Sequence, residues 1–403
     1  MAKGLILGLP LQGHMTPLLA LVRDLVSRGD DLVVYSTPPF AADIEQTGAQ
    51  FRRYRPGRLD DLTQLPDRTE AISMLLMGIV GEVLDADLPE MRAARPDYIV
   101  TDSVAPWGHW VAQVLGVPIA TSVTTFAVNR HVLAFAAAHG VRPKSVGLLV
   151  SKLKHVSNAL ILRRRLSRLH QVRGLGVFRT VFGRSDLNIV YTSRAFQPRS
   201  ETFDRSFHFV GPPAGARTEP AAGFSWPGGM QPMVYVSLGT LFNADVTFYR
   251  HCVAAFRDEP VQVIMSIGSR VSPSDLGAAP ANVVVASYVP QLEVLRRASA
   301  FVTHGGMNSV SESLMMGVPM VAVPQMGEQD LVSRRVEQLS AGLYLAKAEV
   351  SPDRLRLSVR RLLTEERFRQ AAAGLGETLL AAGGTAEAAT RVQAFAMAAT
   401  REP

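Results

Sequence analysis

The chain has 403 residues, of which 47% are hydrophobic and 19% charged, with 32 glycines and 25 prolines spread along its length. It is too long for one ordinary core, so we expect two domains, and the composition excludes both a mini-protein and long disordered stretches. The single cysteine, Cys252, cannot form an internal disulfide, and its apolar helical surroundings predict a core position.

The formal net charge of +7 has one local source. Eleven basic residues and no acidic residue lie between Arg142 and Arg184. Without them, 31 lysines and arginines face 35 acidic residues, which leaves a balance of −4. Most of the chain is therefore mildly acidic, so the net charge alone does not indicate a nucleic-acid-binding protein.

The N-terminal run MAKGLILGLPLQGHMTPLLALV predicts a strand followed by a helix rather than a signal peptide. Its apolar stretch breaks at Pro10 and again at 12–14, and it has no cleavage site of small residues. The longest later apolar run, 71–81, is too short to span a bilayer. We therefore expect a soluble, cytoplasmic protein.

Short apolar runs alternate with helical patterns, which predicts βα units around parallel sheets in both halves of the chain. Expected strands of the first half are 4–9, 31–36, 98–101 and 119–121, with helices at 17–28, 41–47, 69–94 and 107–115. Expected strands of the second half are 233–237, 261–266, 283–287, 300–303 and 319–324, with helices at 251–257, 290–297 and 308–316. The segment 351–400 is mostly helical in pattern.

A Gly- and Pro-rich passage at 211–232 interrupts this periodicity and predicts an interdomain linker. The domains it would join are 1–210 and 233–403, and the last helix could pack back on the first domain. Ligands of doubly wound sheets bind at the C-terminal ends of the strands, so a cleft between two such domains is the expected site.

In the first domain, LPLQGHMTP at 9–17 places His14 after the first strand and immediately before a helix with an early proline. Such a histidine is either a surface or structural residue, or a base at the rim of the cleft. Asp102 ends the strand 98–101. Its carboxylate could hold the tautomer of a catalytic histidine and stabilise the imidazolium, or it could cap the following helix.

In the second domain, SAFVTHGGMNSVSESLMMGVP at 299–319 predicts a buried strand, a glycine pair and a helix that ends at Gly317. The N–H groups from Gly306 to Ser309 and the helix dipole would form an anion site, and His304 could donate another hydrogen bond. Glu312 lies one turn after Ser309, within reach of ribose hydroxyls beside a bound phosphate. The alternative is an ordinary glycine-rich βα turn.

Two neighbouring motifs favour a nucleotide-sugar site. Tyr288-Val-Pro-Gln291 offers an aromatic ring for a base, and Glu328-Gln329 offers polar groups for sugar hydroxyls. With these motifs, the chain resembles the family-1 glycosyltransferases of GT-B fold, in the bacterial macrolide and natural-product branch. The match extends from Tyr288 to Gln329. The loop 237–240 matches the family's other phosphate-side loop, or it is a plain βα turn.

The resemblance implies an α/β fold of two doubly wound, parallel-sheet, Rossmann-like domains, with the acceptor bound by 1–210 and the nucleotide sugar by 233–403. It implies that His14 is the catalytic base, with Asp102 as its partner. It also implies that Tyr288 stacks on the base, where the family commonly has tryptophan. The donor-binding residues it implies are Gly13, Ser237, Gly239, Thr240, Tyr288, Val289, Gln291, His304, Gly306, Asn308, Ser309, Glu312, Glu328 and Gln329.

The implied reaction is an inverting transfer from a UDP-sugar, with a dTDP-sugar as the alternative donor, to a hydroxyl of a small, largely apolar natural product. No metal or other cofactor is expected. Asp85-Ala-Asp87 sits at the end of a helical pattern, not after a strand. Rival hypotheses are a lipid-directed N-acetylglucosaminyltransferase at the membrane surface, and a nucleotide-sugar epimerase or binding module without transfer.

The acceptor side is less specific. Met74 and Met77 recur on one predicted helix and suit either adaptable ligand binding or core packing. The basic segment 142–184 is a solvated face, a lid over an acidic or membrane-partitioned acceptor, or an RNA-binding patch. The expected partners are a nucleotide sugar and a small hydrophobic acceptor rather than nucleic acid, with the protein a monomer or homodimer.

Overall fold

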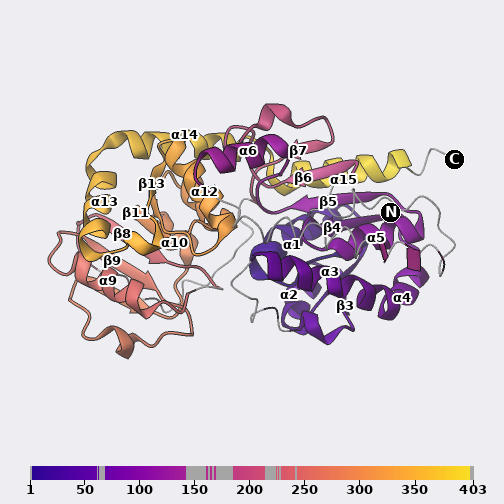
Figure 1. Ribbon diagram of the computed structural model, residues 1–403, viewed down its shortest axis with the longest axis horizontal. Helices are drawn as coiled ribbons and strands as arrows, with labels where there is room; N and C mark the ends of the chain where they lie inside the picture. Colours follow the sequence, from indigo (N-terminus) through magenta and orange to yellow (C-terminus); the bar gives the residue numbers. More distant parts are fainter. Residues whose placement is uncertain are drawn as a thin grey trace. The chain divides into compact units, whose positions relative to one another are not determined.

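The computed structural model describes residues 2–60, 62, 69–141, 160–161, 164–165, 168, 185–213, 224, 226, 228–240 and 243–399. The chain divides into two compact units, each built around its own parallel sheet (Figure 1). The first unit takes the chain up to Ala216, apart from 138–141, and resumes at Ala382. The second takes 138–141 and the chain from Arg217 to Ala381.

The first unit has a seven-stranded sheet in the order β3-β2-β1-β4-β5-β6-β7, with all neighbouring strands parallel. Its strands are β1 Lys3–Leu7, β2 Asp31–Ser36, β3 Gln50–Arg53, β4 Tyr98–Asp102, β5 Ile119–Val123, β6 Leu187–Val190 and β7 Phe207–Phe209. The helices are α1 Gln12–Ser27, α2 Ala41–Glu45, α3 Thr69–Ala86, α4 Leu88–Ala93, α5 Pro106–Leu115, α6 Arg130–Ala138, which runs to the unit boundary, and α15 Gly384–Ala399.

Helices cover both faces of this sheet, which is why its central strands are continuous apolar runs rather than alternating ones. Successive side chains of a strand point to opposite faces. Leu5 and Leu7 of β1 therefore pack in one core with α3 and α5, while Ile6 packs in another with α1 and α15. The sheet is the middle of three layers.

The second unit has a six-stranded parallel sheet in the order β10-β9-β8-β11-β12-β13. Its strands are β8 Met233–Ser237, β9 Gln262–Ser266, β10 Val283–Ala286, β11 Ala298–Thr303, β12 Met320–Ala322 and β13 Gly342–Tyr344. The helices are α9 Val246–Phe256, α10 Gln291–Leu295, α11 Met307–Met315, α12 Gly327–Gln338, α13 Pro352–Thr364 and α14 Glu366–Leu380. Cys252 is fully buried in the core of this unit, as expected.

The strands predicted from the sequence are all present, those at 31–36 and 233–237 with the predicted bounds and the others with shifted ends. Four further strands in the described part of the chain were missed. β3 carries polar residues at a sheet edge, β7 and β13 have three residues each, and β6 follows the basic segment. The helix predicted at 69–94 is divided into α3 and α4. The break lies at Asp87, whose buried carboxylate accepts hydrogen bonds from the backbone N–H of Arg55.

The C-terminal helix α15 belongs to the first unit. Arg28 of α1 donates hydrogen bonds to Thr390 Oγ1 at 2.8 Å and to the carbonyl oxygen of Ala386 at 2.7 Å. Val392 is buried in the core that α1 also lines. Figure 1 shows this helix, in yellow, beside β6. Among the residues that the structure describes, no helix is both long and apolar enough to cross a membrane.

Candidate active site

The first group of predicted site residues lies where the strand order of the first sheet reverses. β1 has β2 on one side and β4 on the other, so the β1/β4 junction is the topological switch point at which such sheets bind ligands. Asp102 is the last residue of β4. The prediction that His14 precedes a helix was wrong, because α1 begins at Gln12 and places His14 in its first turn. The cause is that the residues of this turn show no apolar period.

The structure brings His14 and Asp102 together. His14 Nδ1 lies 2.8 Å from Asp102 Oδ2, and the Asp102 side chain is fully buried while His14 is 15% exposed. A carboxylate beside Nδ1 favours the tautomer with the proton on Nδ1, which leaves Nε2 as the basic nitrogen. Asp102 does not cap the following helix. Its Oδ1 accepts a hydrogen bond from the N–H of Val104, whereas the N-cap of α5 is Ala105.

Thr124 is a third member of this group, and sequence analysis missed it. It directly follows β5, the neighbour of β4, and only 3% of it is exposed. Its Oγ1 lies 3.0 Å from His14 Nδ1. Gly13, a predicted donor contact, is exposed in the first turn of α1. Apart from its chain neighbours and the backbone of its own helix, no atom lies within 4 Å of the position where a side chain would begin.

The second group lies at the corresponding switch point of the second sheet, between β8 and β11. Ser237 ends β8, and His304 directly follows β11. The imidazole of His304 lies between two glycines, because a Cβ on Gly239 would come within 2.6 Å of its Cε1 and a Cβ on Gly306 would overlap its Nε2. Gly239 also has a φ of +76°, which favours glycine.

His304 is neutral at pH 7 in this environment. Burial lowers its pKa to about 4, against the opposing effect of a hydrogen bond with the Ser237 backbone. Helix α11 begins two residues after Gly305, with Gly306 as N-cap, no side-chain cap and no acidic residue in its first turn. The N-terminal N–H groups and the helix dipole therefore favour an anion at the start of α11, the segment that includes Asn308 and Ser309.

Glu312 is held by a buried hydrogen-bond network. Gln291 Nε2 donates a hydrogen bond to Glu312 Oε2 and lies 3.5 Å from Ser309 Oγ, while the hydroxyl of Tyr235 donates to Gln291 Oε1 at 3.1 Å. Gln291 and Glu312 are 8% and 9% exposed. Tyr235 was not predicted as a site residue, because it lies inside β8, where an aromatic residue indicates only core packing.

The other predicted donor contacts differ in exposure. Tyr288 is 61% exposed, whereas Val289 is buried. Glu328 is exposed in the first turn of α12. Gln329 is buried, and its Oε1 accepts a hydrogen bond from the N–H of Gln325 at 2.8 Å. Thr240, at the end of the loop after β8, is exposed.

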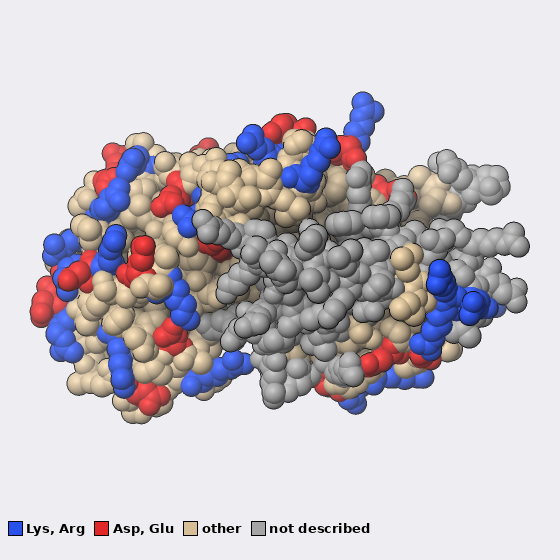
Figure 2. All heavy atoms as spheres, in the orientation of Figure 1, with Lys and Arg blue, Asp and Glu red and all other residues tan. Residues whose placement is uncertain are grey.

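The predicted acceptor residues Met74 and Met77 lie on α3, but their side chains are outside the described residues. The same holds for most of the basic segment 142–184 and of the linker passage 211–232. Of the basic segment, Arg165 forms an ion pair of 2.6 Å with Asp85 on α3. On the face of the second unit in Figure 2, Lys and Arg side chains are interspersed with Asp and Glu.

Each carboxylate of the Asp85-Ala-Asp87 sequence has a basic partner. Asp85 is paired with Arg165, and Asp87 is buried beside Arg55. Burial raises the pKa of Asp87 to about 6. Across the described part of the chain, no group of three or more His, Cys, Asp or Glu side chains is arranged as metal ligands.

Comparison with known proteins identifies the class. Residues 253–395 match the family model described as "Erythromycin biosynthesis protein CIII-like, C-terminal domain". NDP-glycosyltransferase YjiC of Bacillus subtilis is 33% identical over 393 residues, which cover 96% of each chain. Demethyllactenocin mycarosyltransferase of Streptomyces fradiae is 32% identical over 406 residues, covering 96% of this chain and 84% of the relative.

The crystal structure of CalG4, the calicheamicin glycosyltransferase, matches with a TM-score of 0.81 and 29% identity over 98% of both chains. Two doubly wound, parallel-sheet units with this match define the GT-B fold of glycosyltransferases. The chain belongs to the family-1 glycosyltransferases, in the bacterial macrolide and natural-product branch.

Proposed function

We propose that the protein is an inverting, metal-independent hexosyltransferase that uses His14 as its general base. It would move a sugar from a UDP-sugar, or a dTDP-sugar, to a hydroxyl of a small, largely apolar natural product. The observation that carries this proposal is the 2.8 Å contact between His14 Nδ1 and the fully buried Asp102 carboxylate. A binding module without chemistry would have no need of this pair.

The Asp102 carboxylate gives the base its function in two ways. It holds the proton of the neutral imidazole on Nδ1, so Nε2 is the nitrogen that accepts the proton of the acceptor hydroxyl. It then stabilises the imidazolium that forms. A base positioned in this way contributes about 10²- to 10⁴-fold in rate.

The transfer is a single displacement at the anomeric carbon. The acceptor oxygen forms a bond to this carbon as the bond to the diphosphate oxygen breaks, the hydroxyl proton passes to Nε2, and the electron pair leaves with the diphosphate. Attack from the opposite face converts an α-linked donor into a β-linked product. One base and one site for the leaving group are sufficient for this reaction.

The residues after β11 support a role in accepting the charge of the leaving diphosphate. The N–H groups at the start of α11 are donors that are in place before the reaction, so they need little reorganisation as charge develops. This source of stabilisation, together with the arginine partners of Asp85 and Asp87, supports a mechanism without a metal ion.

The donor assignment is supported by Glu312, a buried carboxylate suited to ribose hydroxyls, and by the exposed ring of Tyr288, suited to a base. UDP-glucose is the leading donor. The acceptor class is supported by the relatives, one of which is named for transfer of mycarose to demethyllactenocin, and by CalG4, named for calicheamicin.

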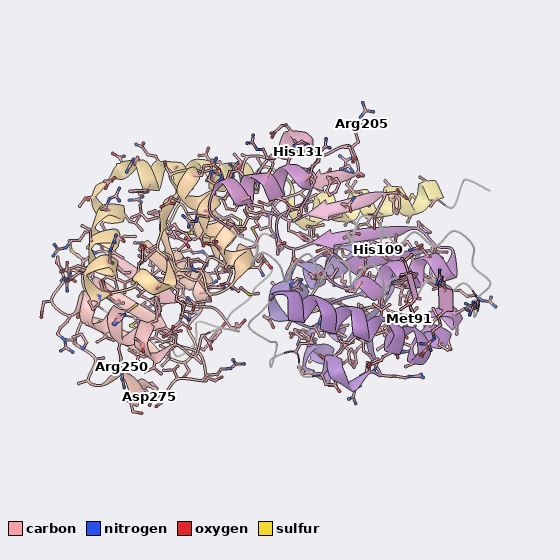
Figure 3. All side chains as sticks on the ribbon, in the orientation of Figure 1. Met91, His109, His131, Arg205, Arg250 and Asp275 are labelled. Carbon is pink, nitrogen blue, oxygen red and sulfur yellow. The ribbon has the colours of Figure 1, made fainter. Side chains whose placement is uncertain are left out.

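The test is mass spectrometry of reactions with pooled UDP- and dTDP-sugars and a panel of macrolides and phenols, with and without EDTA. We expect wild type to form a glycoside and a nucleoside diphosphate in both conditions, with a β-linkage by NMR, and His14→Ala to form neither. His131→Ala is the matched control, because His131 is exposed on α6 (Figure 3). Consumption of no donor by wild type would overturn the transfer itself. Equal product from His14→Ala would overturn the role of His14.

A further inference from the structure

We propose that Thr124 is a positioning residue whose hydroxyl holds the imidazole of His14 in its reactive orientation. This inference rests on the proposed function of His14 and adds a second support to the histidine. Thr124 Oγ1 lies 3.0 Å from the same Nδ1 atom that Asp102 Oδ2 contacts at 2.8 Å.

The two contacts come from neighbouring strands of the sheet. Asp102 ends β4 and Thr124 follows β5, and the strand register aligns these ends by pairing Asp102 with Ser122. Both side chains are buried, with 0% and 3% exposure. Thr124 is β-branched, so its χ1 angle has few alternatives and its hydroxyl oxygen is well fixed. The rigid part of the fold therefore presents two oxygen atoms to one ring nitrogen.

Two acceptors constrain the ring more than one does. A single Nδ1–H···O contact still allows the imidazole to rotate about the hydrogen-bond axis, which moves Nε2 away from an acceptor hydroxyl. A second oxygen on the same N–H makes the hydrogen bond bifurcated and disfavours that rotation. Supporting contacts of this kind hold a catalytic group close to its productive geometry.

The second oxygen also affects the proton affinity of the ring. The imidazolium is a stronger hydrogen-bond donor than the neutral ring, so each acceptor at Nδ1 favours the protonated form. Among the described groups, Asp102 is the charged side chain bonded to the ring. Tyr54 and Tyr191, whose electrostatics couple to Asp102, stay neutral because burial raises the pKa of each phenol. Removal of the Thr124 oxygen should therefore lower the pKa of His14.

The test compares Thr124→Val, which removes the oxygen at nearly constant shape, with Thr124→Ser, which restores it. Thr192→Val is the matched control, because Thr192 is fully buried in the same unit and its hydroxyl has no partner among the described residues. We expect Thr124→Val to lower kcat by about 10- to 100-fold, the range for a hydrogen bond to a charged group, with little change in KM for either substrate. The acidic limb of its kcat/KM profile should move to lower pH.

Thr124→Ser should recover most of the lost kcat and return the acidic limb, and Thr192→Val should match wild type. The inference is overturned if Thr124→Val has the kcat and pH profile of wild type, or if Thr124→Ser restores neither. Circular dichroism checks folding of each variant, and Thr124→Ala replaces Thr124→Val if valine prevents folding. These outcomes test the role of Thr124 separately from the proposed function. If the proposed role of His14 is wrong, His14→Ala itself retains transfer.

Discussion

The two sheets present a histidine at the same topological position but give it opposite properties. At the β1/β4 junction, His14 contacts the buried carboxylate of Asp102, which favours a positive charge on the ring. At the β8/β11 junction, His304 lies between two glycines, and burial lowers its pKa to about 4. Both rings thus lie where such sheets bind ligands, and the residues around each ring decide whether it takes up a proton or stays neutral.

The difference begins with where each helix starts. His14 lies in the first turn of α1, on the helix side of the turn, where Asp102 and Thr124 reach its ring from neighbouring strand ends. His304 lies before α11, so the helix N-terminus and the ring lie on one loop. The first arrangement suits a base that becomes charged, and the second keeps the ring neutral beside a helix N-terminus that favours an anion.

The largest effect is expected for Asp102→Asn, which removes the charged partner of His14. The amide keeps the shape but cannot stabilise an imidazolium, and it can donate to Nδ1, which would favour the wrong tautomer. We expect kcat to fall by about 10²- to 10⁴-fold, the full contribution of a positioned base. Steady-state kinetics with the donor and acceptor found by mass spectrometry measures this change.

Asp85→Asn is the control for Asp102→Asn, because it also removes one carboxylate but lies on α3 in a half-exposed ion pair with Arg165. It should retain the kcat of wild type. If Asp102→Asn keeps kcat within a few-fold of wild type, His14 does not need a charged partner for catalysis. The contrast in charge between His14 and His304 would then have no functional meaning.

At the second switch point, the corresponding change is Gly306→Ala. The backbone of Gly306 has a φ of −68°, which alanine adopts freely, so the effect would come from the methyl group displacing the His304 ring. We expect kcat/KM for the nucleotide sugar to fall by about 10- to 100-fold, because the displaced ring would disturb the diphosphate site beside it. This loss is somewhat smaller than the one caused by a full oxyanion-hole deletion. Stopped reactions at limiting donor concentration measure it.

Gly374→Ala is the matched control for Gly306→Ala. Gly374 lies in α14, and apart from its chain neighbours and the backbone of its own helix, no atom lies within 4 Å of a Cβ built there. Alanine should therefore leave donor kinetics unchanged. An unchanged kcat/KM in Gly306→Ala would mean that the position of the His304 ring is irrelevant to the donor.

Sequence patterns predict the parts of this comparison that depend on local order. Apolar runs locate the central strands, and a polar residue directly after such a strand lies at the ligand-binding end of the sheet, which is sufficient to select Asp102, His304 and the loop at Ser237. The short or polar edge strands β3, β7 and β13 carry too little apolar pattern to be recognised.

The contacts that were missed depend on strand register. The strand predicted at 119–121 continues to Val123, and only its pairing with β4 places Thr124 beside His14. Tyr235 points from the middle of β8 to Gln291, 56 residues away in the chain. Such contacts follow from packing between distant segments, so a local pattern contains no signal for them.

The smallest expected effect is on stability and concerns a third histidine. His109 lies on α5 (Figure 3). It is 3% exposed, its Nε2 has no partner within the described structure, and burial lowers its pKa to about 4. In the unfolded chain this pKa is near 6.5. Between these values the unfolded state binds a proton that the folded state does not, so stability falls as the pH falls.

The contribution of neutral His109 to the free energy of unfolding is therefore fully present above pH 6.5. It is lost by about pH 4, where the free energy of unfolding is lower by up to about 3 kcal/mol. His109→Leu removes this proton linkage. Urea unfolding at pH 7 and pH 4.5 should show a smaller drop in stability for His109→Leu than for wild type, with exposed His131→Ala behaving as wild type. An equal loss of stability in all three proteins would contradict this prediction. It would mean that His109 takes up its proton in the folded state as readily as in the unfolded chain.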